Sequence, residues 1–339
     1  MIGLLWIGLI GAGLAAMLFI PDGIILEQMI SAYYTGETVR LPLSVQPYGV
    51  TIAIGTACAA AVFLAICLVK GRRGNHPLRR GLAFLAGAVC FGFAFSRLLY
   101  CLTSVIFYFR TAGAGAILRW WEGGMSMTGM LLGVLLSAAL TIRKEEKACE
   151  AAVPALAVAI AAARLAEAFG TLGRGKDVEF ENLFSIPDEY GFGSVLNVWL
   201  IELIAVMLIG AAMLAWRAAD RRCPRGFGFL AAFLIVYGIV QILMESLRND
   251  RHMIWGFVKS QQLFSFLLAS LLLMSFAWVR NRKAAAGLMS AALAAAVFGL
   301  EKALDRLDIP DIWIYLVFAV VITGALWFAV YVMRKEKTR

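Results

Sequence analysis

Histidine, cysteine and charged residues are scarce in this sequence. It contains two histidines and six cysteines, and charged residues make up 16% of the chain. His76 and His252 lie far apart in the sequence, whereas a zinc site needs a cluster of histidine and cysteine ligands. The cysteines fall in apolar segments or beside basic loops, where a disulfide framework is not expected. We therefore expect no metal site, no other cofactor and no disulfide-stabilised extracellular domain.

The chain is instead rich in apolar residues, which make up 62% of it. Ten segments are apolar over about 18 residues, the length at which a helix crosses the hydrocarbon core of a bilayer. These segments are about 2–20, 47–69, 82–108, 124–142, 152–172, 195–216, 226–247, 262–280, 284–300 and 312–333. The pattern predicts an all-α polytopic membrane protein with about ten transmembrane helices.

Two of these segments leave alternatives open. Segment 284–300 is short and rich in alanine, which also suits a helix at the membrane surface. Segment 2–20 resembles a secretory signal in length, but no basic residue precedes it and no clear small-residue cleavage site follows it. We interpret segment 2–20 as the first transmembrane helix.

The net charge of +9 is concentrated in alternate loops between the apolar segments. These loops hold 19 of the 31 basic residues: Lys70, Arg72, Arg73, Arg79, Arg80, Arg143, Lys144, Lys147, Arg217, Arg221, Arg222, Arg225, Arg280, Arg282, Lys283, Arg334, Lys335, Lys337 and Arg339. The positive-inside rule predicts that they face the cytoplasm, together with both termini. The charge thus indicates membrane topology and no nucleic-acid partner.

The longest segment on the other side, 173–194, is rich in glycine and acids and is predicted to be an outer loop.

The segment 119–133, at the start of the fourth apolar segment, contains several glycines. Arg119–Gly133 joins a charged, aromatic loop to an apolar helix, and Gly124, Gly129 and Gly133 are spaced along one side of it. Glycine is unfavourable inside a helix unless another backbone approaches closely. We therefore expect a neighbouring helix to pack tightly against this side.

Charged residues within or near the ends of the apolar segments are the best candidates for function. A charge at membrane depth costs about 2.5–3.5 kcal/mol on insertion scales, so such residues usually face a bundle interior. The residues concerned are Arg97, Arg164, Glu167, Glu202 and Glu245. We expect a polar chamber that opens toward the outer leaflet, formed by Glu122, Arg164, Glu167, Glu202, Glu245 and Arg248. Within it, Glu122, Arg164, Gln241 and Glu245 should line one cavity.

The spacing of these residues allows more than one role. Arg97, between Ser96 and Tyr100, could bind a lipid phosphate or pair with a glutamate. Arg164 and Glu167 are three residues apart, the spacing of a local salt bridge on a helix.

A polar stripe follows one face of the segment 226–247. Tyr237, Gln241, Glu245 and Arg248 are spaced at i, i+4, i+8 and i+11. A lone tyrosine in such a helix is usually a packing residue, but four polar residues on one stripe indicate a functional surface.

These segments resemble the prolipoprotein diacylglyceryl transferase family. Trp121-Glu122-Gly123-Gly124-Met125-Ser126 matches its tryptophan-acid-glycine-glycine-methionine-serine signature, and Tyr237, Glu245, Arg248 and Asp250 match its tyrosine-glycine helix. Weaker matches at Tyr48, Glu202 and Gln262 follow in the same order. The resemblance covers about 46–280.

The resemblance implies that the chain binds phosphatidylglycerol and transfers its diacylglyceryl group to the cysteine of a lipobox-containing prolipoprotein. It implies a bacterial plasma membrane location and a seven-helix core at 47–280. Residues 1–46 then add an N-terminal helix and outer loop, and 281–339 add two C-terminal helices and a cytoplasmic tail.

The resemblance also assigns roles to individual residues. The candidate catalytic residues are Glu167, Glu245 and Tyr237. The candidate substrate-binding residues are Tyr48, Arg97, Tyr100, Glu122, Gly123, Gly124, Ser126, Thr128, Arg164, Glu202, Gln241, Arg248 and Gln262.

Among the positions that depart from the family pattern, three bear most directly on the chemistry. Thr128 stands at the family's histidine, Gln241 at an arginine and Glu167 at an asparagine. Threonine is no base near neutral pH and glutamine carries no charge, so the sequence leaves the enzymatic activity open. One interpretation is a divergent transferase in which Glu167 or a nearby glutamate is the base. The others are an inactive homologue that binds anionic phospholipid and, with no repeat to support it, a small-solute transporter.

Overall fold

The computed structural model describes most of the chain from residue 47 onward. The described residues are 47–70, 76–103, 113–118, 124–170, 172–188, 193–249, 254–255, 257–307 and 309–334. The predicted first span, 2–20, lies outside them, as do the candidate site residues Glu122 and Gly123.

Nine α-helices account for most of the described part of the chain. They are α3 (Pro47–Lys70), α4 (His76–Thr103), α6 (Met127–Thr141), α7 (Glu146–Glu167), α8 (Val198–Ala219), α9 (Phe227–Leu247), α10 (Ser260–Val279), α11 (Lys283–Arg306) and α12 (Asp311–Met333), with a short 3-10 helix, η2 (Ala114–Leu118). Eight are long and apolar enough to cross a membrane, and α6, with 15 residues, is shorter. The predicted all-α polytopic membrane fold is confirmed. The doubtful segment 284–300 belongs to a full-length helix, α11.

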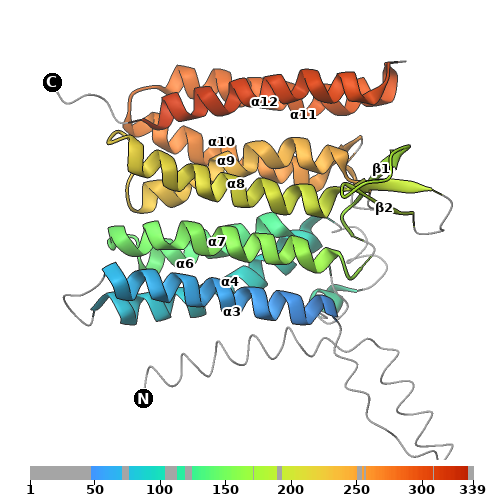
Figure 1. The fold of residues 1–339 in the computed structure, drawn as a ribbon. Coiled ribbons are helices and arrows are strands. Elements are labelled where there is room, and N and C mark those ends of the chain that lie inside the picture. The colour runs from blue at the N-terminus through green and yellow to red at the C-terminus, as the bar shows by residue number, and fades with distance from the viewer. Residues whose placement is uncertain are drawn as a thin grey trace, which may run out of the picture.

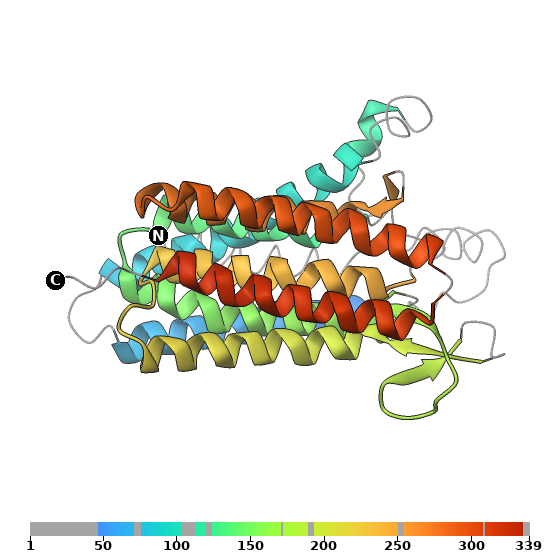
Figure 2. The ribbon, with the colours of Figure 1, turned by 90° about the horizontal axis from the view of Figure 1, so that it is seen from above.

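The helices lie side by side with their axes roughly aligned (Figure 1). Helices α3 and α4 form one edge of the bundle, and α11 and α12 form the other. A view turned by 90° shows the same alignment, with the strands gathered at one end (Figure 2). We call this the strand end; the basic loops α6–α7, α8–α9 and α10–α11 lie at the opposite end.

The interior of the bundle is centred on α7 and α9. In their most apolar windows, 61% of α7 and 67% of α9 is buried, against 28–39% for the other long helices. Side chains at the strand-end termini of α7 and α9 are therefore enclosed by neighbouring helices on several sides.

The predicted close approach to the glycine-bearing helix occurs between α6 and α4. A Cβ atom on Gly129 would lie 2.4 Å from the carbonyl oxygen of Phe95, and one on Gly133 would lie 2.3 Å from that of Phe91. Gly124 differs, because it precedes α6, has φ +73° and packs against the ring of Tyr100. Ser126 caps α6, since its hydroxyl accepts a hydrogen bond from the Gly129 amide at 3.3 Å.

The segment predicted to be an outer loop, 173–194, forms most of a small sheet. Strands β1 (Arg174–Val178), β2 (Ser185–Pro187) and β3 (Ser194–Asn197) pair antiparallel in the order β1-β3-β2. The three strands have only 5, 3 and 4 residues, so no long alternation of apolar and polar residues marks them in the sequence. A second pair, β4 (Ile254–Trp255) with β5 (Val258–Lys259), precedes α10.

The three-stranded sheet is joined to the end of α9. Gly175 of β1 forms a β-bridge with Arg248, and the Asn249 amide donates to the Arg174 carbonyl at 2.8 Å. Strand β3 leads directly into α8. Asn197 caps the N-terminus of α8, because its side-chain oxygen accepts a hydrogen bond from the Leu200 amide at 3.3 Å. The sheet thereby fixes the strand ends of α8 and α9 relative to each other.

Candidate functional site

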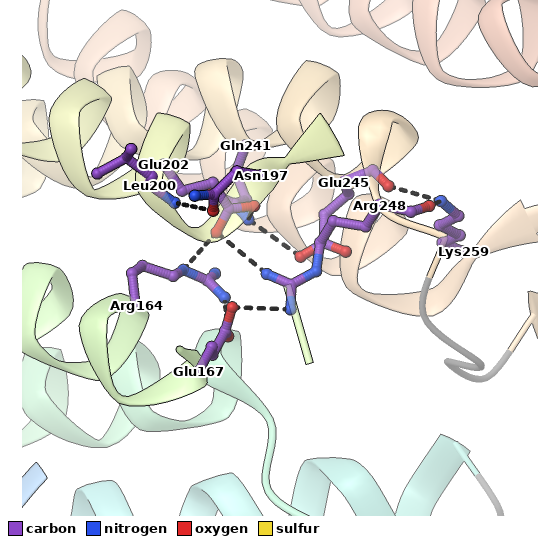
Figure 3. Close-up of polar contacts among 9 residues, drawn as sticks. All are labelled: Arg164, Glu167, Asn197, Leu200, Glu202, Gln241, Glu245, Arg248 and Lys259. Atoms are coloured by element: carbon purple, nitrogen blue, oxygen red, sulfur yellow. Dashed lines mark hydrogen bonds and ion pairs between the residues drawn. The ribbon is translucent and has the colours of Figure 1, made fainter. Parts of the chain in front are cut away.

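A buried polar cluster lies where α7, α8 and α9 meet near the strand end (Figure 3). We define it by six residues that are each less than 9% exposed: Arg164, Glu167, Glu202, Gln241, Glu245 and Arg248. Of the four residues predicted to line one cavity, Arg164, Gln241 and Glu245 are thus brought together, while Glu122 lies outside the described residues.

Two arginines and two glutamates form the centre of the polar cluster. Arg164 Nη1 donates to Glu167 Oε1 at 2.6 Å, and Arg164 Nε pairs with Glu202 Oε2. Arg248 closes the ring: its Nη2 donates to Glu167 Oε2 at 3.0 Å and its Nη1 to Glu202 Oε2 at 3.1 Å. Each carboxylate therefore bridges both guanidinium groups.

Gln241 connects this ring to the third glutamate. Its Nε2 donates to Glu202 Oε1 at 3.3 Å and to Glu245 Oε1 at 3.0 Å. An arginine at this position would bring a positive charge to the same two carboxylates, whereas the glutamine brings only hydrogen bonds.

Lys259 completes the charges around the cluster. Its Nζ donates to the carbonyl oxygen of Glu245 at 2.7 Å and to that of Arg248. With every group ionised, Arg164, Arg248 and Lys259 balance the three glutamates. Lys259 was not predicted to be a site residue, because its contacts depend on strand β5, which places its side chain beside the C-terminal end of α9.

Tyr237 lies beside Arg164 on the inner side of the cluster. The Tyr237 hydroxyl and Arg164 Nη2 are both buried, and the Arg164 guanidinium lies within hydrogen-bonding reach of the Tyr237 hydroxyl; neither atom has another partner among the described residues. Buried donors are normally satisfied, so these two can both donate to an acceptor oxygen of a ligand. Tyr48, at the start of α3, is also within electrostatic range of Arg164, Glu167 and Arg248.

The sheet closes the cluster on the side of Glu167. Gly173 has φ +73°, and its carbonyl oxygen accepts from the amides of Val198 and Trp199, each at 3.1 Å. This turn brings the Gly173 backbone against the Glu167 carboxylate.

The remaining predicted site residues gather around α4, α6 and α10. Arg97 donates from Nε to the carbonyl oxygen of Ile117 at 3.1 Å and from Nη1 to that of Gly124 at 3.2 Å. Its guanidinium carbon lies 5.9 Å from the centroid of the Tyr100 ring. These contacts tie α4 to the backbone of η2 and to the segment before α6.

Thr128 is engaged by a glutamine that was not predicted to be a site residue. The Thr128 hydroxyl donates to Gln261 Oε1 at 3.1 Å, and Gln261 Nε2 donates to the Ser126 hydroxyl at 3.0 Å. The neighbouring Gln262 is buried on another face of α10, where its Nε2 donates to the carbonyl oxygen of Ile242 at 3.0 Å. The sequence match to Gln262 gave no sign that Gln261 contacts α6.

Helix α12 also reaches the elements around the polar cluster. The Tyr315 hydroxyl donates to the carbonyl oxygen of Ser246 at 3.0 Å, and Lys176 Nζ contacts Asp311 Oδ2 at 2.7 Å. Partial burial lowers the pKa of Lys176, but its hydrogen bond to Asp311 and the nearby charges outweigh burial and raise that pKa above its ordinary value. The helix therefore holds both α9 and β1.

Comparison with known proteins identifies relatives of most of the chain. The family model described as prolipoprotein diacylglyceryl transferase matches residues 37–278, so α11 and α12 lie beyond the match. A phosphatidylglycerol–prolipoprotein diacylglyceryl transferase of Symbiobacterium thermophilum is 26% identical over 270 residues, which cover 73% of this chain and 92% of the relative. A protein of the same name from Leifsonia xyli is 29% identical and covers 62% and 67%, respectively. One from Legionella pneumophila is 34% identical over 146 residues, which cover 41% and 54%.

Proposed function

Because this chain belongs to the prolipoprotein diacylglyceryl transferase family, we propose that it binds phosphatidylglycerol with the headgroup phosphate at Arg164. The relatives are named for phosphatidylglycerol and prolipoprotein, which supports these as the lipid and the protein partner. The family match supports lipid binding and diacylglyceryl transfer in preference to the transport of a small solute.

The observation that carries this proposal is the pair of buried donors on α7 and α9. The Arg164 guanidinium lies within hydrogen-bonding reach of the Tyr237 hydroxyl, and neither Arg164 Nη2 nor the Tyr237 hydroxyl has a partner beyond this pair among the described residues. Phosphate oxygens accept strong hydrogen bonds from guanidinium groups in water-poor surroundings. We place the phosphate at Arg164 rather than at Arg97, because main-chain oxygens already occupy two donors of Arg97.

The membrane orientation of the proposal follows from the charged loops. Exposed Arg143, Arg221 and Arg225 are among the basic residues at the opposite end of the bundle, which the positive-inside rule assigns to the cytoplasm. The strand end and the polar cluster then face the outer leaflet, and the described C-terminal end of α12 lies on the cytoplasmic side.

Lipid retention by the purified protein tests the proposal. We expect wild-type protein in a mild detergent to retain phosphatidylglycerol, and Arg164→Ala to reduce its affinity by about 10- to 100-fold, the scale of a charge-assisted hydrogen bond. Arg225→Ala removes an exposed arginine at the opposite end and serves as the control. Equal retention by wild type and folded Arg164→Ala protein would refute a phosphate site at Arg164.

Diacylglyceryl transfer is the second candidate function, favoured by the position of Glu245 and Tyr237 on the same stripe of α9. In this reaction a cysteine thiol passes its proton to a carboxylate, and the sulfur attacks the glycerol carbon next to the phosphate. A carbon–sulfur bond forms, the carbon–oxygen bond breaks, and glycerol phosphate leaves with the bonding electrons. Arg164 and Arg248 would stabilise the charge on the leaving phosphate.

Two other residues, Thr128 and Gln241, limit the rate of transfer. The Thr128 hydroxyl donates a hydrogen bond to Gln261 and is not a base near neutral pH, and Gln241 adds no charge. We therefore propose lipid binding as the principal function, with slow transfer to an ordinary lipobox peptide. Mass spectrometry of a lipobox peptide incubated with the protein and phosphatidylglycerol measures this directly, because transfer adds a diacylglyceryl group to the peptide.

A further inference from the structure

Glu167 occupies a position between the two arginines that suits an anionic ligand. Its Oε1 accepts from Arg164 at 2.6 Å and its Oε2 accepts from Arg248 at 3.0 Å. A phosphate group also presents separate oxygens to separate guanidinium groups. The carboxylate therefore makes the same two-point contact that a lipid phosphate would make there.

Glu167 is less firmly held than the other bridging carboxylate. Glu202 accepts from Arg164, Arg248 and also Gln241, and its side chain is 2% exposed, against 8% for Glu167. Glu202 lies in the second turn of α8, beyond the first turn in which the helix dipole favours a negative charge. Glu167 is the last residue of α7, where the dipole disfavours one. Of the two, Glu167 is the carboxylate that an incoming anion would displace.

We propose that Glu167 is a specificity-determining residue that competes with the phosphate of an anionic lipid for Arg164 and Arg248. The inference rests on the proposed function, since it assumes that phosphatidylglycerol binds at Arg164. With Lys259 included, the charges of the polar cluster sum to zero while Glu167 bridges the arginines, and an additional phosphate makes the sum negative. A headgroup phosphate that contacts both arginines requires Glu167 to leave at least one of them.

Neutralising Glu167 tests the proposal, because it removes the competing charge and nearly preserves the shape. We expect Glu167→Gln to bind phosphatidylglycerol about tenfold more tightly than wild type, measured by native mass spectrometry or by titration of labelled lipid. Diacylglycerol has the same acyl chains without phosphate, and we expect its binding to be unchanged. Glu179→Gln removes an exposed carboxylate at the same end of the bundle and is the matched control.

The outcomes separate this inference from the proposed function. If wild type binds phosphatidylglycerol through Arg164 and Glu167→Gln binds it equally well or less well, the competition is refuted and the proposed function stands. If neither protein binds phosphatidylglycerol, both are refuted. A similar gain for diacylglycerol would show that the substitution opens space rather than removing a competing charge, and would overturn the proposal.

A second variant guards against a failure to fold. Glu167→Asn is shorter and also neutral, so we expect the same tighter binding if Glu167→Gln cannot be purified. If both neutral variants are unfolded by circular dichroism and size-exclusion chromatography, the carboxylate is structurally indispensable. A group that the lipid displaces cannot be indispensable to the fold, so this result would also overturn the proposal.

Discussion

Gly173 lies so close to Glu167 that a Cβ atom on the glycine would be 2.6 Å from Glu167 Oε2. The same atom would lie 2.7 Å from Cβ of Trp199, and the φ of +73° is itself unfavourable for other residues. The sheet and the polar cluster therefore depend on each other through a position that only glycine fits.

We expect Gly173→Ala to lower thermal stability by about 1–3 kcal/mol, because it combines a strained backbone with a steric clash. Thermal unfolding of the detergent-purified protein measures the loss. Gly193→Ala is the control, since its Cβ would meet no atom within 4 Å. Equal melting temperatures for the two variants would contradict the tight packing of the sheet against Glu167.

We expect Gly129→Ala and Gly133→Ala to force α4 and α6 apart. Each new Cβ would lie less than 2.5 Å from a carbonyl oxygen of α4, and backbone cannot give way as a flexible side chain can. Overpacking of this kind costs about 1–3 kcal/mol or more. Unfolding or proteolysis of each variant should be compared with Gly324→Ala, where the Cβ would meet no atom within 4 Å. Unaltered stability at both positions would disprove the close approach.

We expect the variant combining Thr128→His, Gln241→Arg and Glu167→Asn to transfer more diacylglyceryl to a lipobox peptide than wild type does. The three changes supply a base, add a cation beside Glu202 and Glu245, and remove the carboxylate between the arginines. General-base assistance alone is worth about 10²–10⁴-fold in rate. The measurement is the lipidated peptide formed per unit time. Rapid transfer by the wild-type chain would contradict this account of the missing groups.

We expect Tyr315→Phe to destabilise the protein by about 0.5–1.5 kcal/mol, the net value of one hydrogen bond. The lost bond joins α12 to the carbonyl oxygen of Ser246 near the end of α9. Tyr331→Phe tests the same chemical change at the other end of α12, where the side chain is 49% exposed. A smaller effect at Tyr315 than at Tyr331 would argue against a bracing role for α12.

The sequence predicts the helices well, because apolar length is a local property. All nine predicted spans that fall in the described part of the chain coincide with helices, although α6 is shorter than segment 124–142. The close approach at Gly129 and Gly133 is likewise predicted from the cost of glycine in a helix. The sheet at 174–197 was missed, since its pairing depends on backbone hydrogen bonds between short strands.

The candidate site is less predictable, because its contacts join distant helices. The spacing of Arg164 and Glu167 predicts their local salt bridge, which is present. Nothing local indicates that Arg248 pairs with the same glutamate, 81 residues away in sequence. For Arg97, the sequence leaves a phosphate or a glutamate open as the partner, and nothing local in it indicates the two main-chain oxygens that η2 and the turn before α6 bring close.

The division of the ion pairs among α7, α8 and α9 also implies an order of assembly during membrane insertion. Helix α7 carries both Arg164 and Glu167, so it can leave the translocon with its charges neutralised internally. Helix α8 brings Glu202 with no arginine of its own before residue 217, and Arg248 is synthesised only at the end of α9. Arg164 of α7 is therefore the counter-charge that reaches Glu202 first, so α7 must remain beside the insertion site until α8 arrives. If α7 moved away before that point, Glu202 would enter the lipid without a counter-charge until Arg248 followed at the end of α9.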